Sequence, residues 1–245
     1  DVDGGGQLQY TFPIALPPGI KSVAPQVNLI YSSNSTNGIA GYGWSFSGIT
    51  SISRTGKNLD KDGEVKGIDL NYNDLFQFNG QRLVLVSGEY GKDGAIYKTE
   101  KFSNIRIKSV GAITGKNWNG PSYFEVTFED GSQAWYGNTT SSDNTAVTAV
   151  EYNIVKWKDA QGNYISYEYT QSNNVALISK INWGGNETVG SSHFNSIVFN
   201  YKNRELIETS YLNGNNTGIK FVQSKLLSDI TVNANGSLFK KYTLD

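Results

Sequence analysis

The chain has 245 residues, only 18% of them charged, and its formal net charge is −1. This balance excludes the basic field with which proteins dock on nucleic acid or anionic membrane. Cysteine is absent and His193 is the only histidine, so disulfides, cysteine-bound zinc and multi-histidine metal centres are excluded as well.

The hydrophobic fraction of 38% predicts a packed core rather than a disordered chain. No apolar run approaches the ~20 residues that span a bilayer, so we expect no membrane insertion by this domain. Methionine is absent and the chain opens at Asp1. We therefore expect a processed piece of a longer polypeptide, folded as one continuous domain over residues 1–245 with a sub-sheet division near residues 138–145.

Alternating apolar and polar residues predict β-strands along the whole chain, and no segment has a sustained 3.6-residue apolar period. In chain order the expected strands are residues 8–16, 26–33, 44–54, 104–110, 150–158, 164–170, 176–183 and 195–202. The fold class we expect is all-β, with antiparallel meander and hairpin sheets that form a sandwich or a curled, open shell segment.

Asn-Gly and Asp-Gly dipeptides, which favour the type I′ turns of tight hairpins, punctuate this pattern. Three of them predict hairpins, at Asn79-Gly80, Asp130-Gly131 and Asn235-Gly236. The first would place Phe76, Phe78, Leu83 and Leu85 on one face, and the second would place Phe124, Val126, Phe128 and Trp135 together. Further Asn-Gly pairs begin at Asn37, Asn119 and Asn213.

The search for reactive groups is mostly negative. His193 follows two serines, but nothing else in the sequence indicates a catalytic triad. Residues 60–64 resemble the start of a calcium loop but lack its later ligands. Residues 41–43 resemble a glycine-rich phosphate loop, but they lead into a strand and not into the helix whose N-terminus would bind the phosphate. We therefore expect no catalytic residue, no cofactor-binding residue, no metal ligand and no cofactor. Two carboxylate pairs, Glu125 with Glu129 and Glu205 with Glu208, leave a hydrolase as an alternative.

Five tryptophans raise the alternative of a carbohydrate-binding or adhesive cell-surface module. Trp44, Trp135 and Trp157 lie in alternating strands, where a role in the core is expected. Trp118 lies in a polar loop, and it is the candidate for an exposed contact surface.

The first 54 residues carry a dense series of prolines, glycines and aromatics. Its prolines suit the edge of a sheet or the start of a strand, because they offer no backbone donor. Its glycines allow tight turns before an aromatic strand. The members of this signature are Pro13, Pro17, Pro18, Gly19, Pro25, Tyr31, Gly38, Gly41, Gly43, Trp44 and Arg54.

This order of motifs resembles the N-terminal domain of the SpvB (virulence plasmid B protein) family, which also begins Tc toxin B components and many RHS-repeat proteins. Residues 74–85 resemble the hairpin that follows the signature in that family. Residues 159–169 are similar to a YD-repeat phrase, and Arg204 also fits, although Glu205 stands where an aspartate is more usual.

The resemblance implies a non-enzymatic structural module of a large secreted toxin-like protein. Its partners would be other domains of the same polypeptide, namely a β-propeller, an RHS shell and a C-terminal effector, together with a Tc-type channel subunit. It implies a secreted or cell-surface location after a stage in the cytoplasm, and no nucleic-acid partner.

Overall fold

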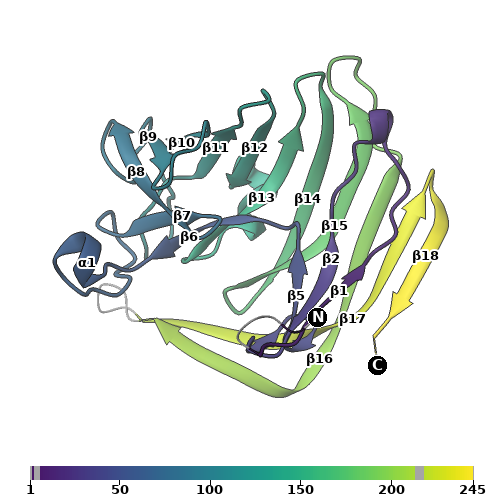
Figure 1. Cartoon of the computed structure of the whole chain (residues 1–245), viewed down its shortest axis with the longest axis horizontal. Coiled ribbons are helices and arrows are strands. Elements are labelled where there is room, and N and C mark those ends of the chain that lie inside the picture. The colour runs from purple at the N-terminus through teal and green to yellow at the C-terminus, as the bar shows by residue number, and fades with distance from the viewer. Residues whose placement is uncertain (1, 3–5, 213–217, 245) are drawn as a thin grey trace.

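The computed structural model describes residue 2 and residues 6–212 and 218–244. Almost all regular structure in it is antiparallel β-sheet, as the alternating sequence predicts (Figure 1). The Asn213-Gly214 turn that the sequence suggests lies outside the described residues.

Eight consecutive strands form a closed, barrel-like sheet, because each pairs with the next and the last returns to the first. They are β6 (Ser51–Thr55), β7 (Leu75–Phe78), β8 (Gln81–Ser87), β9 (Ile96–Thr99), β10 (Arg106–Val110), β11 (Tyr123–Thr127), β12 (Gln133–Gly137) and β13 (Glu151–Lys158). Closure leaves these strands without a long free edge.

The sheet branches at β13. The first residues of β13 pair with β6, and its last residues pair with β14. From there an open sheet curls around the molecule, as Figure 1 shows in green and yellow. Its strands are β14 (Asn163–Ser172), β15 (Val175–Asn186), β16 (Asn195–Leu212), β17 (Ile219–Ala234) and β18 (Ser237–Thr243).

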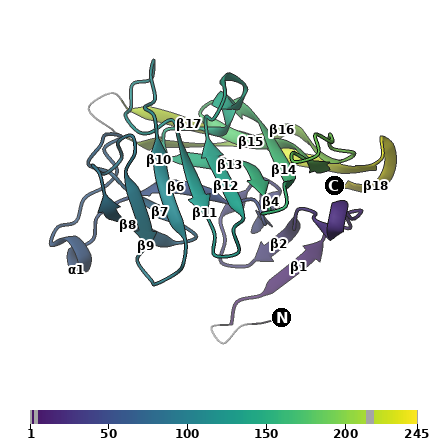
Figure 2. The ribbon, with the colours of Figure 1, turned by 90° about the horizontal axis from the view of Figure 1, so that it is seen from above.

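A small N-terminal sheet packs against the open sheet (Figure 2). It consists of β1 (Gln9–Pro13), β2 (Asn28–Ser32) and β5 (Trp44–Ser47), with a short pair β3 (Asn37–Gly38) and β4 (Gly41–Tyr42) at its side. Phe46 meets Phe199 of β16 with ring centroids 5.1 Å apart, and Phe12 meets Tyr242 of β18 at 5.6 Å. The fold therefore combines a closed sheet with a curled sheet that is covered on one face.

Within the described residues, helix is confined to three short turns: η1 (Ile20–Ser22), α1 (Leu59–Asp62) and η2 (Ser141–Ala146). The segment compared above with a calcium loop forms α1. Asn58 caps it and Gly63 ends it in the left-handed conformation. Asp62 pairs with Arg82 at 2.7 Å, so this carboxylate serves the packing of α1 on the closed sheet.

Aromatic side chains fill the closed sheet. Phe76, Phe124 and Tyr152 are almost fully buried and meet one another with ring centroids 5.0–5.9 Å apart. Edge-to-face pairs of this kind each add about 0.5–1.5 kcal/mol beyond the burial of their area. The interior is thus a packed core and not a channel.

Two predicted hairpins have the expected turns. Asn79-Gly80 and Asn235-Gly236 both have two successive positive φ angles, as a type I′ turn requires. Phe76, Phe78 and Leu83 are buried together as expected, but Leu85 is 38% exposed, because β8 beyond Leu83 is exposed on both faces.

The predicted face of Trp135 is wrong. Phe128 and Ser132 close a wider turn than a two-residue hairpin, so that Thr127 pairs with Gln133 and Glu125 pairs with Trp135. A register change of one residue moves every side chain to the other face. Tyr136 therefore points inward, and Trp135 lies outside beside Lys156.

The predicted strand 44–54 is two strands, because the chain bends sharply at Gly48 between β5 and β6. Gly48 has φ +82°, and a Cβ there would lie 1.6 Å from the carbonyl oxygen of Gln26. The sequence patterns also miss β9, and they end β16 ten residues before Leu212.

Candidate functional site

Arg54, the last residue of the N-terminal signature, lies at the centre of a buried polar cluster. Its side chain has no exposed surface and pairs with Asp74 at 2.9 Å. Its Nε donates to the carbonyl of Ala149 at 2.7 Å, and its terminal nitrogens donate to the carbonyls of Asn71 and Asn119. One guanidinium therefore holds three loops that meet at one end of the closed sheet.

Aromatic rings enclose this guanidinium. Its Cζ lies 5.2 Å from the centre of the Phe76 ring and 5.6 Å from that of Trp118. Gly120 is required beside it, since a Cβ there would lie 2.4 Å from the Tyr152 hydroxyl and 2.9 Å from the Arg54 Nη2. Burial raises the pKa of Tyr152, so this hydroxyl stays neutral next to the cation. The cluster is therefore structural: it acts as a lock that fixes three loops relative to one another and to the closed sheet.

The signature prolines form a strap across the open sheet. Pro13 ends the edge strand β1, and the buried Pro17 accepts a hydrogen bond from the Trp183 indole at 3.0 Å. Pro18 accepts one from the Asn195 amide at 3.1 Å. Gly19 follows, where a Cβ would lie 2.1 Å from the Val23 carbonyl oxygen. The carbonyls of these prolines thus tie the N-terminal segment to β15 and β16.

The remaining signature residues shape the turn before β5. The Trp44 ring packs on Tyr31 at 5.4 Å, half-buried rather than within the core as the sequence suggested. Gly43 has φ +80°, and a Cβ there would lie 2.6 Å from the Tyr31 ring. Gly41 also has a positive φ, and Pro25 is buried just before β2.

Arg204 forms a second clamp, between the open sheet and the β3–β4 pair. Its guanidinium donates to the Asn37 side chain at 2.9 Å and to the carbonyl of Gly38, while its Nε donates to the carbonyl of Lys225 at 2.8 Å. The sequence showed this arginine only through the family resemblance, because two of its partners, Asn37 and Gly38, lie more than 160 residues away in the chain.

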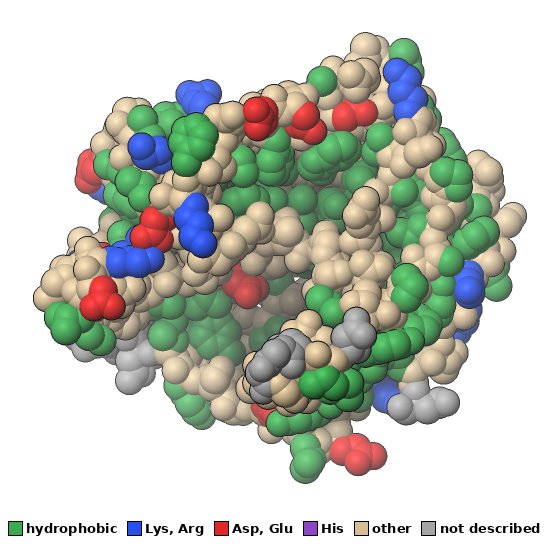
Figure 3. Space-filling model, viewed as in Figure 1, with side chains coloured by type: hydrophobic (Ala, Val, Ile, Leu, Met, Phe, Trp, Pro, Cys, Tyr) green, Lys and Arg blue, Asp and Glu red, His purple; other side chains and the backbone are tan. Residues whose placement is uncertain are grey.

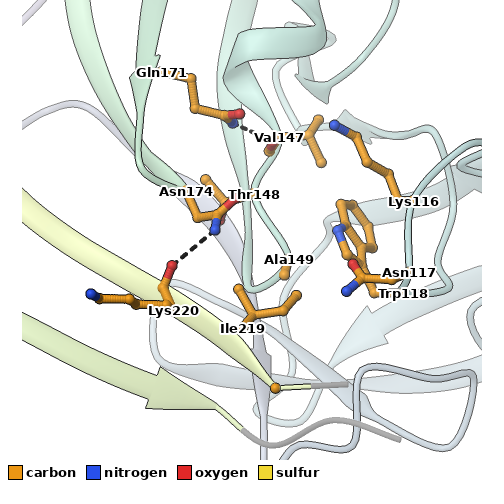
Figure 4. A pocket seen from close by; sticks show the side chains of 11 residues that line it. Lys116, Asn117, Trp118, Val147, Thr148, Ala149, Gln171, Asn174, Ile219 and Lys220 are labelled. Atoms are coloured by element: carbon orange, nitrogen blue, oxygen red, sulfur yellow. Dashed lines mark hydrogen bonds between the residues drawn. The ribbon is translucent and has the colours of Figure 1, made fainter. Parts of the chain in front are cut away.

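Trp118 is buried, with 5% exposure, and the expectation of an exposed contact surface at this residue is wrong. Its loop folds inward because the Asn119 amide donates to the carbonyl of Leu70 and Arg54 covers the indole. The ring borders a cavity of about 280 Å³ together with Lys116 and Ala149 (Figure 4). The same view shows the side chains of Gln171 and Asn174 bonded to main-chain carbonyls.

The large sheet has one free end. Since β12 and β13 close the ring, only β18 has no strand partner on its outer side among the described residues. Leu238 and Phe239 on β18 are 65% and 50% exposed, and Lys240 and Lys241 follow them. An open edge with apolar side chains is the usual template for pairing with another strand, and lysines keep such an edge soluble.

The other candidates from the sequence have local partners. The His193 ring contacts the Tyr164 ring at a tilt of 47° with ring centroids 4.1 Å apart, and burial lowers the pKa of His193. Glu129 accepts from Asn104, and Glu208 accepts from Asn37. Within the part of the chain that the structure describes, no group of three or more histidine, cysteine, aspartate or glutamate side chains could hold a metal ion. In this same part, no helix has the length and hydropathy for a membrane span.

Fold and site together define an all-β module that is held together internally by the buried Arg54 and the half-buried Arg204, and whose large sheet is open along β18 among the described residues. The chain belongs to the SpvB family, described as Salmonella virulence plasmid 65kDa B protein, whose family model matches residues 3–228. A search of curated proteins finds no match.

Solved structures share this fold at low sequence identity. The N-terminal domain of the effector protein SpvB from Salmonella typhimurium strain LT2 is 17% identical with a TM-score of 0.67, covering 96% of this chain and 98% of that one. A TcdB2-TccC3-Cdc42 complex is 15% identical with a TM-score of 0.69, covering 98% of this chain. The Photorhabdus luminescens Tc holotoxin pore is 15% identical with a TM-score of 0.64, covering 94%. The chain spans only 14% and 13% of these last two chains.

Proposed function

We propose that this domain is a non-enzymatic structural module of a large secreted, toxin-like protein of the RHS or Tc type. Its task would be to build one section of a shell wall and to dock neighbouring domains of the same polypeptide. The observation that carries the proposal is that, among the described residues, β18 is the one strand at an end of the large sheet without a partner on its outer side, while the other end of this sheet is closed by the pairing of β12 with β13.

The described contacts make the domain rigid. A closed ring, a strap of prolines, the buried Arg54 and the half-buried Arg204 hold together the domain on which β18 lies. A rigid edge can be extended by further strands at little entropic cost, because its own backbone is already ordered. The following strands would come from a propeller and an RHS shell that encloses a C-terminal effector, and a Tc-type channel subunit would dock outside.

The relatives support this context. Their names place similar folds within Tc toxin assemblies with TccC3 and within the effector SpvB. A secreted or cell-surface location follows from that context, and the net charge of −1 gives no reason to expect nucleic acid as a partner.

A structure of the longer polypeptide that carries this domain tests the proposal. We expect β18 to be hydrogen-bonded on both sides, and Leu238 and Phe239 to be covered. A longer polypeptide in which β18 still faces solvent would contradict the proposal. So would a purified domain that turns over a substrate and loses this activity when a single side chain is replaced.

A further inference from the structure

A cleft of about 370 Å³ lies between the start of β13, the β14–β15 turn and the far ends of β16 and β17. Its walls are largely apolar, with Ile68, Val150, Val175, Leu212 and Phe221. Figure 3 shows the face of the molecule seen in Figure 1, which is hollowed in the middle and has hydrophobic side chains above the hollow. The volume is within the range of about 300–1,000 Å³ typical of ligand pockets.

Glu151 is the one charged side chain among the described residues that line this cleft. Tyr152, its neighbour in β13, points into the closed sheet, so Glu151 faces outward toward the cleft. It is half-buried, and in the described part of the chain it forms no ion pair. Burial raises the pKa of Glu151, and a hydrogen bond with the Asn153 side chain offsets only part of this effect.

Among the described residues that line the cleft there is no lysine, arginine or histidine, and the cation beside its Tyr211 wall is the Lys220 ammonium, 6.0 Å from the Tyr211 ring. Tyr211 lines the cleft and is 70% exposed, and Tyr169 lies near Glu151 with its hydroxyl bonded to the carbonyl of Ile154. Lys116 and Lys220 border the adjoining Trp118 cavity instead, and the two spaces share Thr148 and Asn174.

A carboxylate taken from water without a cationic partner destabilises the fold. Natural proteins keep an unpaired, half-buried charge of this kind mainly at functional sites. We propose that this cleft is a socket for a lysine or arginine side chain carried by a docking protein segment, with the Glu151 carboxylate as its counter-ion.

Both walls of the cleft suit such an occupant. The aliphatic stem of a lysine or arginine packs on apolar surface while its charged head meets the carboxylate. An exposed aromatic ring such as Tyr211 can also attract a cation, and it already lies 6.0 Å from the Lys220 ammonium. The inference rests on the proposed docking function and names the chemistry of one contact. Its test uses the domain alone, so its failure is distinguishable from a failure to pair β18.

The first test measures, through the melting temperature, how much the charged Glu151 carboxylate destabilises the free domain. The unfolded pKa is near 4.5, and the folded pKa is higher, so the cost is absent at low pH and grows as pH rises through this range. Glu151→Gln should raise the melting temperature by roughly 2–4 °C at pH 7.5, and it should leave the temperature unchanged at pH 3.5. The exposed Glu205→Gln is the matched control and should change neither. A Glu151→Gln variant that is less stable at pH 7.5 would show that this carboxylate already has a stabilising cationic partner and would overturn the proposal.

The second test measures recognition. We would follow the Glu151 carboxyl by NMR while adding the peptide acetyl-Gly-Arg-Gly-amide or the same peptide with neutral citrulline. The arginine peptide should lower the pKa of Glu151 and shift the signals of Tyr211 and Phe221, whereas the citrulline peptide should not. Glu151→Gln should abolish the difference between the peptides. Equal responses to both peptides, or none up to tens of millimolar, would refute the socket.

Discussion

Replacing Arg54 should destabilise the domain more than any exposed charge substitution. In Arg54→Met, Asp74 keeps its buried carboxylate, with 3% side-chain exposure, but loses its counter-ion. Removing one partner of a buried ion pair costs about 3–5 kcal/mol. The carbonyls of Ala149, Asn71 and Asn119 also lose their donor. A buried carbonyl that loses its donor costs about 1–3 kcal/mol, but water that enters this end of the sheet can hydrogen-bond the three carbonyls and offset part of that cost. We therefore expect the free energy of unfolding to fall by about 4–6 kcal/mol in total.

Urea denaturation at pH 7 measures this loss. Lys57→Met, which breaks an exposed pair with Glu64, is the control and should cost below about 1 kcal/mol. A typical domain is stable by only ~5–15 kcal/mol, so a loss of this size can leave Arg54→Met unfolded. Arg54→Lys is therefore the second variant. It keeps the charge but loses the fork that reaches several acceptors. The double variant Arg54→Met/Asp74→Asn should recover part of the loss. A cost of Arg54→Met similar to that of Lys57→Met would refute the role of Arg54 as a lock.

Three further predictions concern other parts of the fold. Gly162→Ala should lower the free energy of unfolding in urea by about 1–3 kcal/mol, because the φ of Gly162 is +91° and a Cβ there would lie 2.2 Å from the Thr188 hydroxyl. The control is Gly80→Ala, which should cost less because Gly80 has a positive φ but open space around it. Trp183→Phe leaves the Pro17 carbonyl without its donor and should lower the free energy of unfolding by about 1–3 kcal/mol. Backbone amides in the proline strap should then exchange faster with solvent, and unchanged exchange there would contradict this prediction. Burial raises the pKa of Tyr136 to about 12, so the stability it contributes is complete below pH 10 and is lost between pH 10 and 12. Absorbance titration of the phenols should show this late ionisation, and ionisation of all tyrosines near pH 10 would contradict it.

Local sequence chemistry predicted much of the fold. The Asn79-Gly80 and Asn235-Gly236 turns follow from residues that accept positive φ, and alternation alone located most strands. The N-terminal signature identified the family, and three of its glycines, Gly19, Gly38 and Gly43, stand where a Cβ would lie within 2.6 Å of a neighbouring atom. These constraints lie within a few residues of each other, so the sequence displays them directly.

Long-range pairing could not be predicted in the same way. Ring closure depends on β13 meeting β6, about 100 residues earlier, and no turn motif encodes that contact. The inward fold of Trp118 depends on Arg54 and Leu70, and the role of Glu151 depends on β16 and β17. The sequence pattern predicts the wrong face for Trp135, because the turn after Phe128 is wider than the two-residue turn that Asp130-Gly131 favours.

Amide hydrogen exchange on β18 tests most directly whether the domain works as a wall section with one edge to be covered. The amides of Ser237–Thr243 on the outer side should exchange fast in the domain alone and far more slowly in the longer polypeptide, while the closed sheet stays protected in both. Equally fast exchange of β18 in both proteins would show that nothing pairs with this edge and would contradict the account.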